Sequence, residues 1–370
     1  MKNKKRVLFV AHIDNHIQAF HIPFLKLFKD NDYIVDVASN GNSKFKYCDH
    51  KYNLPFQRTP FSLDNLRAYT QLKKILNENN YDIIHCHTPV GGFITRLANK
   101  NCNYYEDTKI IYTAHGFHFF NNNNFFKNFL FKNIEKYAAK YTDILITINQ
   151  EDYNAGQHFQ LKNNGKLFLI PGVGINLDYI NQVRFNKNTF MNSLNIPIES
   201  KILLSVGELN TNKNHIVVLK ALKTLPHYFH YVICGDGDNK TKLLKEIHHL
   251  ELDDRVHILG YKKNIYEIMK CCDFFLFPSK REGLSVALME AMACGLPCVV
   301  SKIRGNEDLI ENEKGGYCVD LENEKFNIYI NKILELGLSK SMSAFNYNKV
   351  SNYSIKKVNL KMREIYERNE

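Results

Sequence analysis

The 370-residue chain is 44% hydrophobic and 24% charged, the composition of an ordinary soluble protein, and at this length two domains are favoured over a single core. No apolar run approaches the roughly 18–20 residues of a membrane span. The apolar run at 7–11 is too short for the hydrophobic region of a signal peptide. Nine cysteines without a disulfide spacing pattern indicate a reducing cytoplasm. The formal charge of +11 suits an anionic partner; without dense basic stripes, a membrane surface or a phosphate-bearing lipid is favoured over nucleic acid.

Positive charge is concentrated in the first half of the chain. Residues 1–185 carry 23 lysines and arginines against 15 aspartates and glutamates, whereas residues 186–370 carry 26 against 23. We therefore expect the first half to face the anionic partner.

Short apolar, β-rich runs alternate with helix-length segments along the chain. The strand candidates are 6–11, 34–38, 83–86, 110–113, 144–148, 167–170, 202–206, 230–234, 256–259, 274–277 and 298–301. The helix candidates include 63–78, 128–140, 215–224, 240–249 and 264–271. Such alternation predicts parallel sheets covered on both faces. The polar stretch 181–200 interrupts it, so we expect two Rossmann-like doubly wound domains, 1–185 and 186–350, facing across a cleft that binds ligands beyond the strand ends.

Strand ends in the first half carry the first candidate functional residues. The turn 11-AHIDNHIQAF-20 contains no glycine and places Asp14, Asn15 and His16 after the first strand. His115, followed by Gly116, comes directly after another strand, where it can bind a sugar hydroxyl or stabilise a leaving group, or serve structure alone.

The triplet 85-HCH-87 points two histidines to one face of a strand. No matching pair of metal ligands is evident in the sequence, so metal binding is disfavoured.

The stretch 117–141 is aromatic and basic. On a helix, Phe126, Leu130, Ile134 and Tyr137 share one face, which is the pattern of core packing. A second face mixes aromatic and basic side chains: Phe125, Phe129, Lys132 and Lys136. That mixture leaves contact with a membrane interface as the alternative.

In the second half, Lys213 lies in a polar loop after the strand end at Gly207. It can neutralise a phosphate or be an ordinary solvated lysine. Gly235 and Gly237 follow the next strand and allow a ligand to approach the backbone, although a plain turn explains them as well. Because the third glycine of a dinucleotide fingerprint is missing, hydride transfer with a nicotinamide cofactor is disfavoured.

The stretch 280-KREGLSVALMEAMACGLP-297 holds two glutamates eight residues apart, Glu282 before a helix and Glu290 inside it. Ser285 is a candidate N-cap, and Gly295 and Pro297 predict a sharp helix stop. The free N–H groups at the helix start would suit an anion such as a diphosphate.

Taken together, these residues resemble the glycosyltransferase family 4 enzymes, which are retaining transferases with the GT-B fold, and in particular those that build bacterial capsule, exopolysaccharide or teichoic-type glycans. The resemblance is by motif order over nearly the whole chain and is more specific in the second half. The matching residues are His115 in TAHG, Gly207, Lys213, Gly235, Gly237, and Glu282 with Glu290 as E-x7-E.

The resemblance implies a role for each residue. Lys213 would bind a phosphate of the donor, with Gly207 at the strand end before it. Glu290 would hold the ribose hydroxyls. Glu282 would sit near the donor sugar, which His115 faces from the other domain. His115, Glu282 and Lys213 are thus the candidate catalytic residues.

The same resemblance places Gly235 and Gly237 near the nucleobase and gives Gly283, Leu284 and Ser285 contacts with the diphosphate or donor sugar. Retention of the anomeric configuration would follow from front-face attack through an oxocarbenium-like state, rather than from a glycosidase-type pair of carboxylates. No cofactor or metal is expected.

The expected donor is a UDP-sugar, with GDP as the alternative, and the expected acceptor is a lipid-linked glycan bound by the first domain. The enzyme would be cytoplasmic and peripheral at the inner face of the cell membrane, held to anionic lipid by 2–6 and 119–136. The last segment, 351–370, would be a helix that packs back on the first domain.

Two departures from the family pattern stand out. Glu208 occupies the position where most relatives carry an arginine that helps Lys213 hold the diphosphate, and we hypothesise that Arg281 or Arg304 compensates. The glycine pair after the first strand is also absent, which leaves Asp14, Asn15 and His16 as acceptor-side candidates.

Two other functions fit the sequence less well. A UDP-N-acetylglucosamine 2-epimerase-like enzyme would use a similar cleft, but the Glu282 and Glu290 spacing with Lys213 favours a transferase. A non-catalytic nucleotide-sugar-binding scaffold would explain Glu208 alone. The sugar, the linkage and the oligomeric state are not readable from the sequence.

Overall fold

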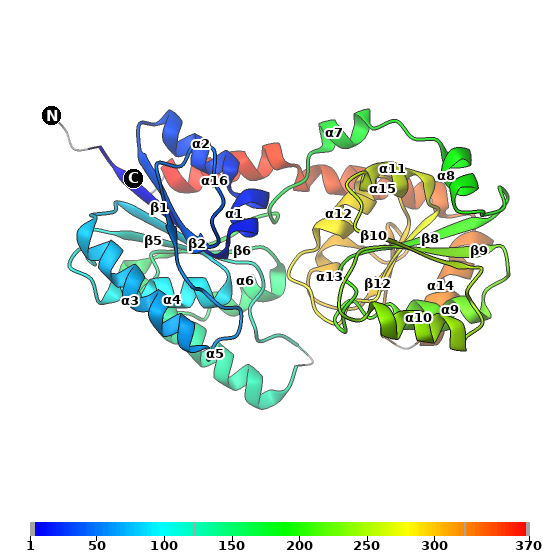
Figure 1. The fold of residues 1–370 in the computed structure, drawn as a ribbon, viewed down its shortest axis with the longest axis horizontal. Coiled ribbons are helices and arrows are strands. Elements are labelled where there is room, and N and C mark those ends of the chain that lie inside the picture. Colours follow the sequence, from blue (N-terminus) through cyan, green and yellow to red (C-terminus); the bar gives the residue numbers. More distant parts are fainter. Residues whose placement is uncertain (1–3, 122, 322, 368–370) are drawn as a thin grey trace. The chain divides into compact units, whose positions relative to one another are not determined.

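The computed structural model describes residues 4–121, 123–321 and 323–367. The chain forms two compact units: the first takes in the chain up to Gly172 together with the residues from Asn359 on, and the second is Val173–Val358. Each unit has a parallel sheet between two layers of helices (Figure 1). The domain limits expected from the sequence, 185 and 350, stay predictions.

The first unit is a doubly wound sheet. Its strands are β1 (Arg6–Ile13), β2 (Ile34–Asn40), β3 (His50–Asn53), β4 (Ile83–His87), β5 (Lys109–Ala114), β6 (Ile144–Thr147) and β7 (Lys166–Leu169). Its helices are α1 (Asp14–Phe20), α2 (Ile22–Asp30), α3 (Leu63–Glu78), α4 (Pro89–Lys100), α5 (Phe125–Ala139) and α6 (Gln150–Gly156). The strand order is β3-β2-β1-β4-β5-β6-β7, with parallel pairing. The order reverses between β1 and β4, and ligands of such sheets bind beyond the carboxyl ends at that point.

The second unit repeats this plan. Its strands are β8 (Lys201–Val206), β9 (Phe229–Cys234), β10 (Val256–Gly260), β11 (Phe274–Phe277), β12 (Cys298–Ser301) and β13 (Gly316–Val319). Its helices are α7 (Leu177–Gln182), α8 (Lys187–Ser193), α9 (Ile216–Thr224), α10 (Lys240–His249), α11 (Ile265–Cys271), α12 (Val286–Ala293), α13 (Asn306–Leu309), α14 (Asn323–Glu335) and α15 (Ser339–Val350). The order β10-β9-β8-β11-β12-β13 reverses between β8 and β11.

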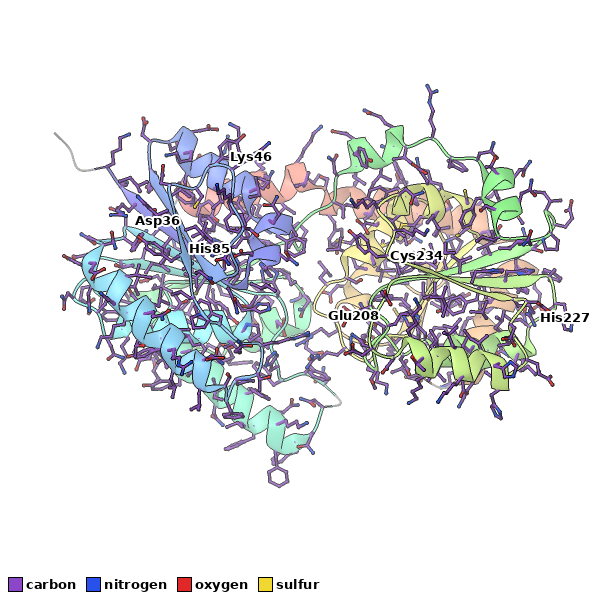
Figure 2. The ribbon with its side chains drawn as sticks, viewed as in Figure 1. Asp36, Lys46, His85, Glu208, His227 and Cys234 are labelled. Carbon is purple, nitrogen blue, oxygen red and sulfur yellow. The ribbon has the colours of Figure 1, made fainter. Side chains whose placement is uncertain are left out.

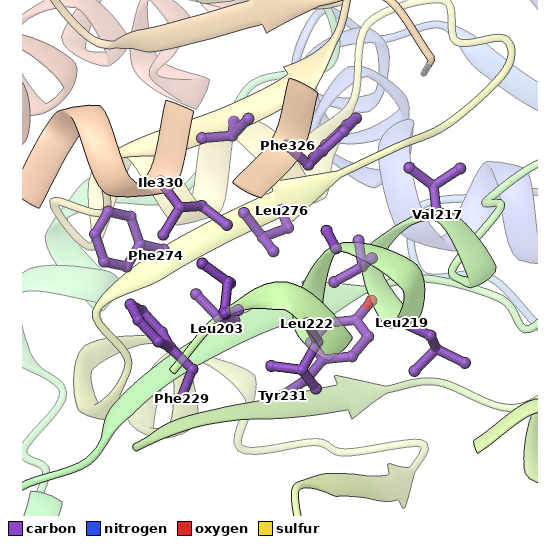
Figure 3. Close-up of a cluster of buried hydrophobic side chains, with 14 of the residues drawn as sticks. Leu203, Val217, Leu219, Leu222, Phe229, Tyr231, Phe274, Leu276, Phe326 and Ile330 are labelled. Atoms are coloured by element: carbon purple, nitrogen blue, oxygen red, sulfur yellow. The ribbon is translucent and has the colours of Figure 1, made fainter. Parts of the chain in front are cut away.

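The core of the second unit shows why these segments fold as they do. All six residues of β9 are buried, as expected of a parallel strand covered on both faces. Leu219 and Leu222 of α9 pack with Leu203 of β8 and Tyr231 of β9 in one cluster (Figure 3). In Figure 1, α9, α10 and α14 cover one face of this sheet, and α11, α12 and α15 cover the other.

The last helix, α16 (Ile355–Glu367), begins among residues of the second unit and continues into residues of the first. Its Tyr366 is buried in the first unit, where its ring packs edge-on against Phe24 and Phe28. The hydroxyl of Tyr366 lies 2.7 Å from Nδ1 of His85. Residues 368–370 of the expected C-terminal helix lie outside the described residues.

The predicted strands are all present, and two more strands had not been predicted. The sequence of β3, HKYN, has no apolar pattern, and its side chains are half-exposed or exposed. In β13, GYCV, the leading glycine and the short length hide the strand. Neither carries the hydrophobic periodicity on which strand prediction depends.

The prediction of core packing for one face of α5 is wrong. Phe126, Leu130 and Tyr137 are 77%, 47% and 45% exposed. The helix instead turns Glu135 inward, where Arg96 donates a hydrogen bond to its carboxylate at 2.9 Å, both side chains being almost completely buried. In this rotation of α5, Phe125, Phe126, Phe129 and Tyr137 are exposed, whereas Phe131 is half-buried and packs against the core. In the part of the chain that the structure describes, no helix is long and apolar enough to cross a membrane.

Candidate active site

The switch point of the second sheet brings Lys213 and Glu282 together. Lys213 follows β8 and Glu282 follows β11, and these two strands are neighbours. The ammonium of Lys213 donates a hydrogen bond to Glu282 Oε1 at 2.7 Å and lies 4.4 Å from the centre of the Phe277 ring. Both charged side chains are more than four-fifths buried. A lysine held at a strand end in this way can exchange its carboxylate partner for a phosphate oxygen.

Helix α12 has the ends that the sequence predicts. Ser285 is its N-cap and accepts a hydrogen bond from Leu288 N–H. Gly295 takes the left-handed conformation at φ +76°. The N–H groups of Gly295 and Leu296 donate to the carbonyls of Met292 and Ala291, which is the Schellman arrangement. Glu282 therefore precedes the helix and Glu290 lies within it, as predicted.

Glu290 has a partner that the sequence did not indicate. The hydroxyl of Tyr266, in α11, donates to Glu290 Oε1 at 2.7 Å, and the ring of Tyr179 packs edge-on against Tyr266. Burial raises the pKa of Glu290, and the hydrogen bond from Tyr266 opposes that rise. A lone tyrosine at the start of a short helix carries no motif, so only the fold reveals this pair.

Gly235 and Gly237, at the end of β9, have a local steric reason to be glycine. A Cβ on Gly235 would collide with the carbonyl oxygen of Gly207, and a Cβ on Gly237 would lie 2.7 Å from that of Leu209. Gly207 N–H also donates to the carbonyl of Cys234. These contacts hold the loops after β8 and β9 close together. Contact of Gly235 and Gly237 with a nucleobase stays a prediction.

Arg281, Arg304 and Glu208 differ in their surroundings. Arg304 is 7% exposed, and its Nε donates to the backbone carbonyl of Glu282 at 3.1 Å. The carbonyl of Arg281 accepts a hydrogen bond from the amide of Asn212. Glu208 is exposed at the carboxyl edge of the sheet, the edge at which Cys234 also lies, whereas His227 is at the opposite edge (Figure 2). Arg304 is thus a second cation beside Glu282, in addition to Lys213, while compensation for Glu208 stays a hypothesis.

In the first unit, the predicted loop after β1 is a helix. Asp14, Asn15 and His16 form the first turn of α1, because β1 runs on to Ile13 and leaves no loop. The carboxylate of Asp14 is buried and accepts hydrogen bonds from Ser39 Oγ at 2.6 Å and Ser43 N–H at 2.7 Å.

Asp14 is also 3.1 Å from Lys51 Nζ. Burial alone raises the pKa of Asp14, but the serine hydrogen bonds and Lys51 outweigh it and leave the pKa below its ordinary value. Asp14 thus joins α1 to the segment after β2. Contact of Asp14, Asn15 and His16 with an acceptor stays a prediction.

His115 lies in a cluster of histidine rings at the carboxyl edge of the first sheet. It follows β5 directly, and its ring packs edge-on against His16 at 4.6 Å between centroids. Its Nε2 is 3.5 Å from Nδ1 of His87, whose ring stacks on that of His21 at 3.8 Å. Burial lowers the pKa of His115 to about 4 and that of His85 to about 3. These rings are therefore neutral at physiological pH.

Among the described residues, His85 and His87 do not belong to the group of histidines that could share a metal ion. His16, His21 and His115 have ligand atoms within 4.8 Å of one another, so they form a group of the kind that can hold a metal ion. Sequence could not reveal the group, because α1 and the end of β5 meet only in the folded sheet. Independence from metal stays a prediction.

Comparisons with known proteins match both halves of the chain. The family model described as glycosyl transferases group 1 matches residues 186–350, and the model described as glycosyl transferase 4-like matches residues 6–149. The putative glycosyltransferase EpsD of Bacillus subtilis is 35% identical over 86% of this chain and 84% of its own. The UDP-Gal:alpha-D-GlcNAc-diphosphoundecaprenol alpha-1,3-galactosyltransferase of Escherichia coli is 28% identical over 77% of this chain and 74% of its own.

Solved structures show the same architecture. HepE from Anabaena in complex with UDP covers 99% of this chain and is itself covered completely, with a TM-score of 0.77 at 18% identity. Sucrose-phosphate synthase from Thermosynechococcus elongatus covers 99% of each chain, with a TM-score of 0.79 at 16% identity.

The chain therefore has the GT-B architecture, with two Rossmann-like units. It belongs to the group 1, family 4-like glycosyltransferases and is a glycosyltransferase. The resemblance seen in the sequence is confirmed, and these relatives give no support to the epimerase or the scaffold.

Proposed function

We propose that this glycosyltransferase moves a sugar from a UDP-sugar to a glycan carried on a polyprenyl diphosphate, in the synthesis of a bacterial surface polysaccharide. One observation carries the donor half of this proposal: Lys213, Arg304 and the start of α12 converge around Glu282 at the switch point of the second sheet. That is where open parallel sheets bind ligands. Cations and helix N–H groups are what a diphosphate requires.

In this proposal Lys213 leaves Glu282 to bind the diphosphate, and the N–H groups of Gly283, Leu284 and Ser285 address the diphosphate or the donor sugar. Glu290, held by Tyr266, accepts hydrogen bonds from the ribose hydroxyls. The bond between the anomeric carbon and the diphosphate oxygen breaks while the acceptor oxygen attacks from the same face. The acceptor's hydroxyl proton passes to the leaving oxygen, and the configuration is retained. Stabilising the departing charge is then the main catalytic contribution.

The acceptor half rests on relatives. The E. coli relative is named for a diphosphoundecaprenol-linked acceptor. A Campylobacter jejuni relative, 26% identical over 86% of each chain, is likewise named for a diphospho-undecaprenol-linked substrate. The neutral ring of His115, at the carboxyl edge of the first sheet, is suited to hydrogen-bond a sugar hydroxyl without competing for a phosphate. We assign no metal to the reaction.

We also propose that the enzyme works at an anionic membrane surface on the cytoplasmic side. The exposed aromatic residues of α5 with Lys132 and Lys136 support this. In the basic segment 2–6, residues 2 and 3 lie outside the described residues, and Arg6 pairs with the buried Asp36 at 2.8 Å. The attachment is therefore assigned chiefly to α5. Co-sedimentation with acidic liposomes at low salt tests it, and a protein that stays in the supernatant would refute it.

The test of the function is release of nucleoside diphosphate from a panel of UDP- and GDP-sugars, with and without a bacterial polyprenyl-lipid extract. Glu290→Ala serves as the blank. Release that depends on one donor, is stimulated by lipid and is lost in the variant supports the proposal. Turnover of the donor without any acceptor, or release that ignores the lipid, contradicts it.

A further inference from the structure

An apolar cavity of about 420 Å³ lies between α3, α4 and α5 of the first unit. It falls within the range of roughly 300–1,000 Å³ typical of small-molecule sites. Its walls are mainly aliphatic and aromatic side chains from the start of α3, the outward side of α4 and the inward side of α5. The lining includes Phe61, Leu66, Pro89, His118 and Glu135.

Part of this cavity lies at the edge of the sheet that carries the acceptor-side candidates. Pro89 opens α4 two residues after His87, the last residue of β4. His118 comes three residues after His115, and β4 pairs with β5. Both residues line the cavity. A ligand whose polar head lies at the histidine cluster can therefore extend an apolar tail between the helices.

The side chains of Asn65, Glu135 and Ser62 in the cavity wall are already bonded within the protein. The amide of Asn65 accepts from Gln57 N–H and donates to the carbonyl of Thr59. Glu135 is paired with Arg96, and Ser62 caps α3. A sugar or a peptide would have to leave its own polar groups unpaired against these walls, which is costly. A hydrocarbon chain loses nothing there.

The surface around the cavity is apolar and positively charged. Phe61 and Leu66 are 81% and 64% exposed, and Phe125, Phe126 and Phe129 stand out from α5. The charged side chains of α5 apart from Glu135 are all lysines, and they are exposed, whereas Glu135 is buried in its pair with Arg96. An apolar opening with a cationic border fits an anionic amphiphile at a membrane.

We propose that this cavity binds the first isoprene units of the polyprenyl chain of the acceptor, with the diphosphate-linked glycan at the carboxyl edge of the sheet. The inference rests on the proposed function, because the lipid-linked acceptor is part of it. It makes the lipid a recognised part of the substrate rather than an anchor alone. The enzyme then gains affinity from the chain as well as from the sugar.

The chain contains no tryptophan, so one tryptophan can report on the cavity. In Phe61→Trp the indole lies at the opening of the cavity. The matched control is Tyr261→Trp, because Tyr261 is 78% exposed in the second unit and does not line the cavity. Each is titrated with geranylgeranyl diphosphate below its micelle-forming concentration. We expect a saturable blue shift of the emission for Phe61→Trp with the prenyl diphosphate, none with inorganic diphosphate, and none for Tyr261→Trp.

Adding Leu66→Glu to Phe61→Trp places a carboxylate at the opening and should raise the concentration for half-maximal shift by about tenfold or more. The matched control is Leu244→Glu, because Leu244 is an apolar residue of α10 that is 49% exposed. Adding it to Phe61→Trp should leave the concentration for half-maximal shift unchanged. No saturable shift, or an equal shift with hexadecyl phosphate, overturns the assignment to an isoprenoid. A shift without ligand that grows with protein concentration, matched by light scattering, overturns it in favour of a second copy of the chain.

The two proposals fail separately. Lipid-stimulated release of UDP with no prenyl-dependent shift rejects the cavity and keeps the transferase. A saturable prenyl shift without transfer from any donor keeps the cavity as a lipid site but removes the acceptor role proposed for it.

Discussion

At the scale of single residues, the pairing of Lys213 with Glu282 matters most, because the ammonium lies 2.7 Å from the carboxylate. In the proposed function, a diphosphate has to displace that carboxylate. The pair thus compensates an ammonium that is more than four-fifths buried, and in the proposed function Glu282 competes with the diphosphate for Lys213.

We expect Lys213→Ala to weaken UDP binding by roughly ten- to a hundredfold, since a charged hydrogen bond contributes about 1.5–3 kcal/mol. Glu282→Gln should have the opposite effect on binding, strengthening it because the lysine loses its competitor, while lowering turnover. Isothermal titration with UDP and the release assay measure the two effects. Lys223→Ala, which removes an exposed ion pair with Glu251, is the control. Equal losses of UDP affinity in Lys213→Ala and Glu282→Gln would mean that the pair is structural.

Burial and the hydrogen bond from Tyr266 act in opposite directions on the pKa of Glu290. Burial raises the pKa of this carboxyl group, and the tyrosine hydrogen bond holds it down. Tyr266→Phe should therefore raise the pKa further, so that Glu290 takes up a proton at a higher pH than in the parent. Because the charged carboxylate is the better acceptor for ribose hydroxyls, the acid side of a UDP-affinity profile between pH 5 and 8 should move upward. An unchanged profile would show that Glu290 does not bind the nucleotide.

At the scale of elements, α12 shows what a local signal can determine. Gly295 has φ +76°, and an added Cβ would lie 2.6 Å from Ser343 Oγ. Gly295→Ala should lower the free energy of unfolding by about 1–2 kcal/mol for the left-handed backbone, and by more for the crowding. Gly337→Ala has the same backbone strain at φ +63° with nothing within 4 Å. Urea denaturation of both variants measures the cost of the contact with Ser343 as the difference between their losses of unfolding free energy. Equal losses would show that Ser343 moves away from the added methyl group.

The two ends of α12 were predictable because each depends on one residue type at one position, Ser285 and Gly295. The buried face of α5 was not, because its rotation is set by Arg96, 39 residues away in the sequence. Hydrophobic periodicity assigned the apolar residues to the core, and a buried ion pair overrode it. Lys213 and Glu282 were found by motif, but Tyr266 was visible only once α11 and α12 packed together.

At the scale of the whole molecule, the same alternation of buried strands and helices occurs in both halves of the chain. From this alternation the sequence predicts two doubly wound domains facing one cleft. In the structure each sheet reverses its order at one point, so each has a strand edge suited to a ligand. The histidine cluster forms at the edge of the first sheet from α1, β4 and the end of β5. The sequence singles out His16, His85, His87 and His115 separately, and only the shared edge brings them together with His21.

This cluster should make global stability depend on pH. Burial lowers the pKa of His115 to about 4 and of His85 to about 3, and that of His21 also falls well below its ordinary value. In the unfolded chain each histidine titrates near about 6.5. As the pH falls below that value, the unfolded state takes up protons that the folded state refuses, so the stability present above about pH 6.5 is progressively lost toward pH 4. Each such histidine contributes up to about 1.4 kcal/mol per pH unit.

Urea denaturation between pH 7 and 4.5 measures this dependence, and the difference between variants separates histidines from carboxylates. His21→Phe keeps an aromatic ring against His87 and removes one titrating group, so the slope of unfolding free energy against pH should decrease by about one proton. His85→Phe is the second variant, in case the larger ring at position 21 disturbs packing. His249→Phe, on the exposed surface of α10, should leave the slope unchanged. Slopes that stay the same in both buried variants would show that His21 and His85 take up protons equally in the folded and the unfolded chain, which contradicts the lowered pKa values of these two histidines.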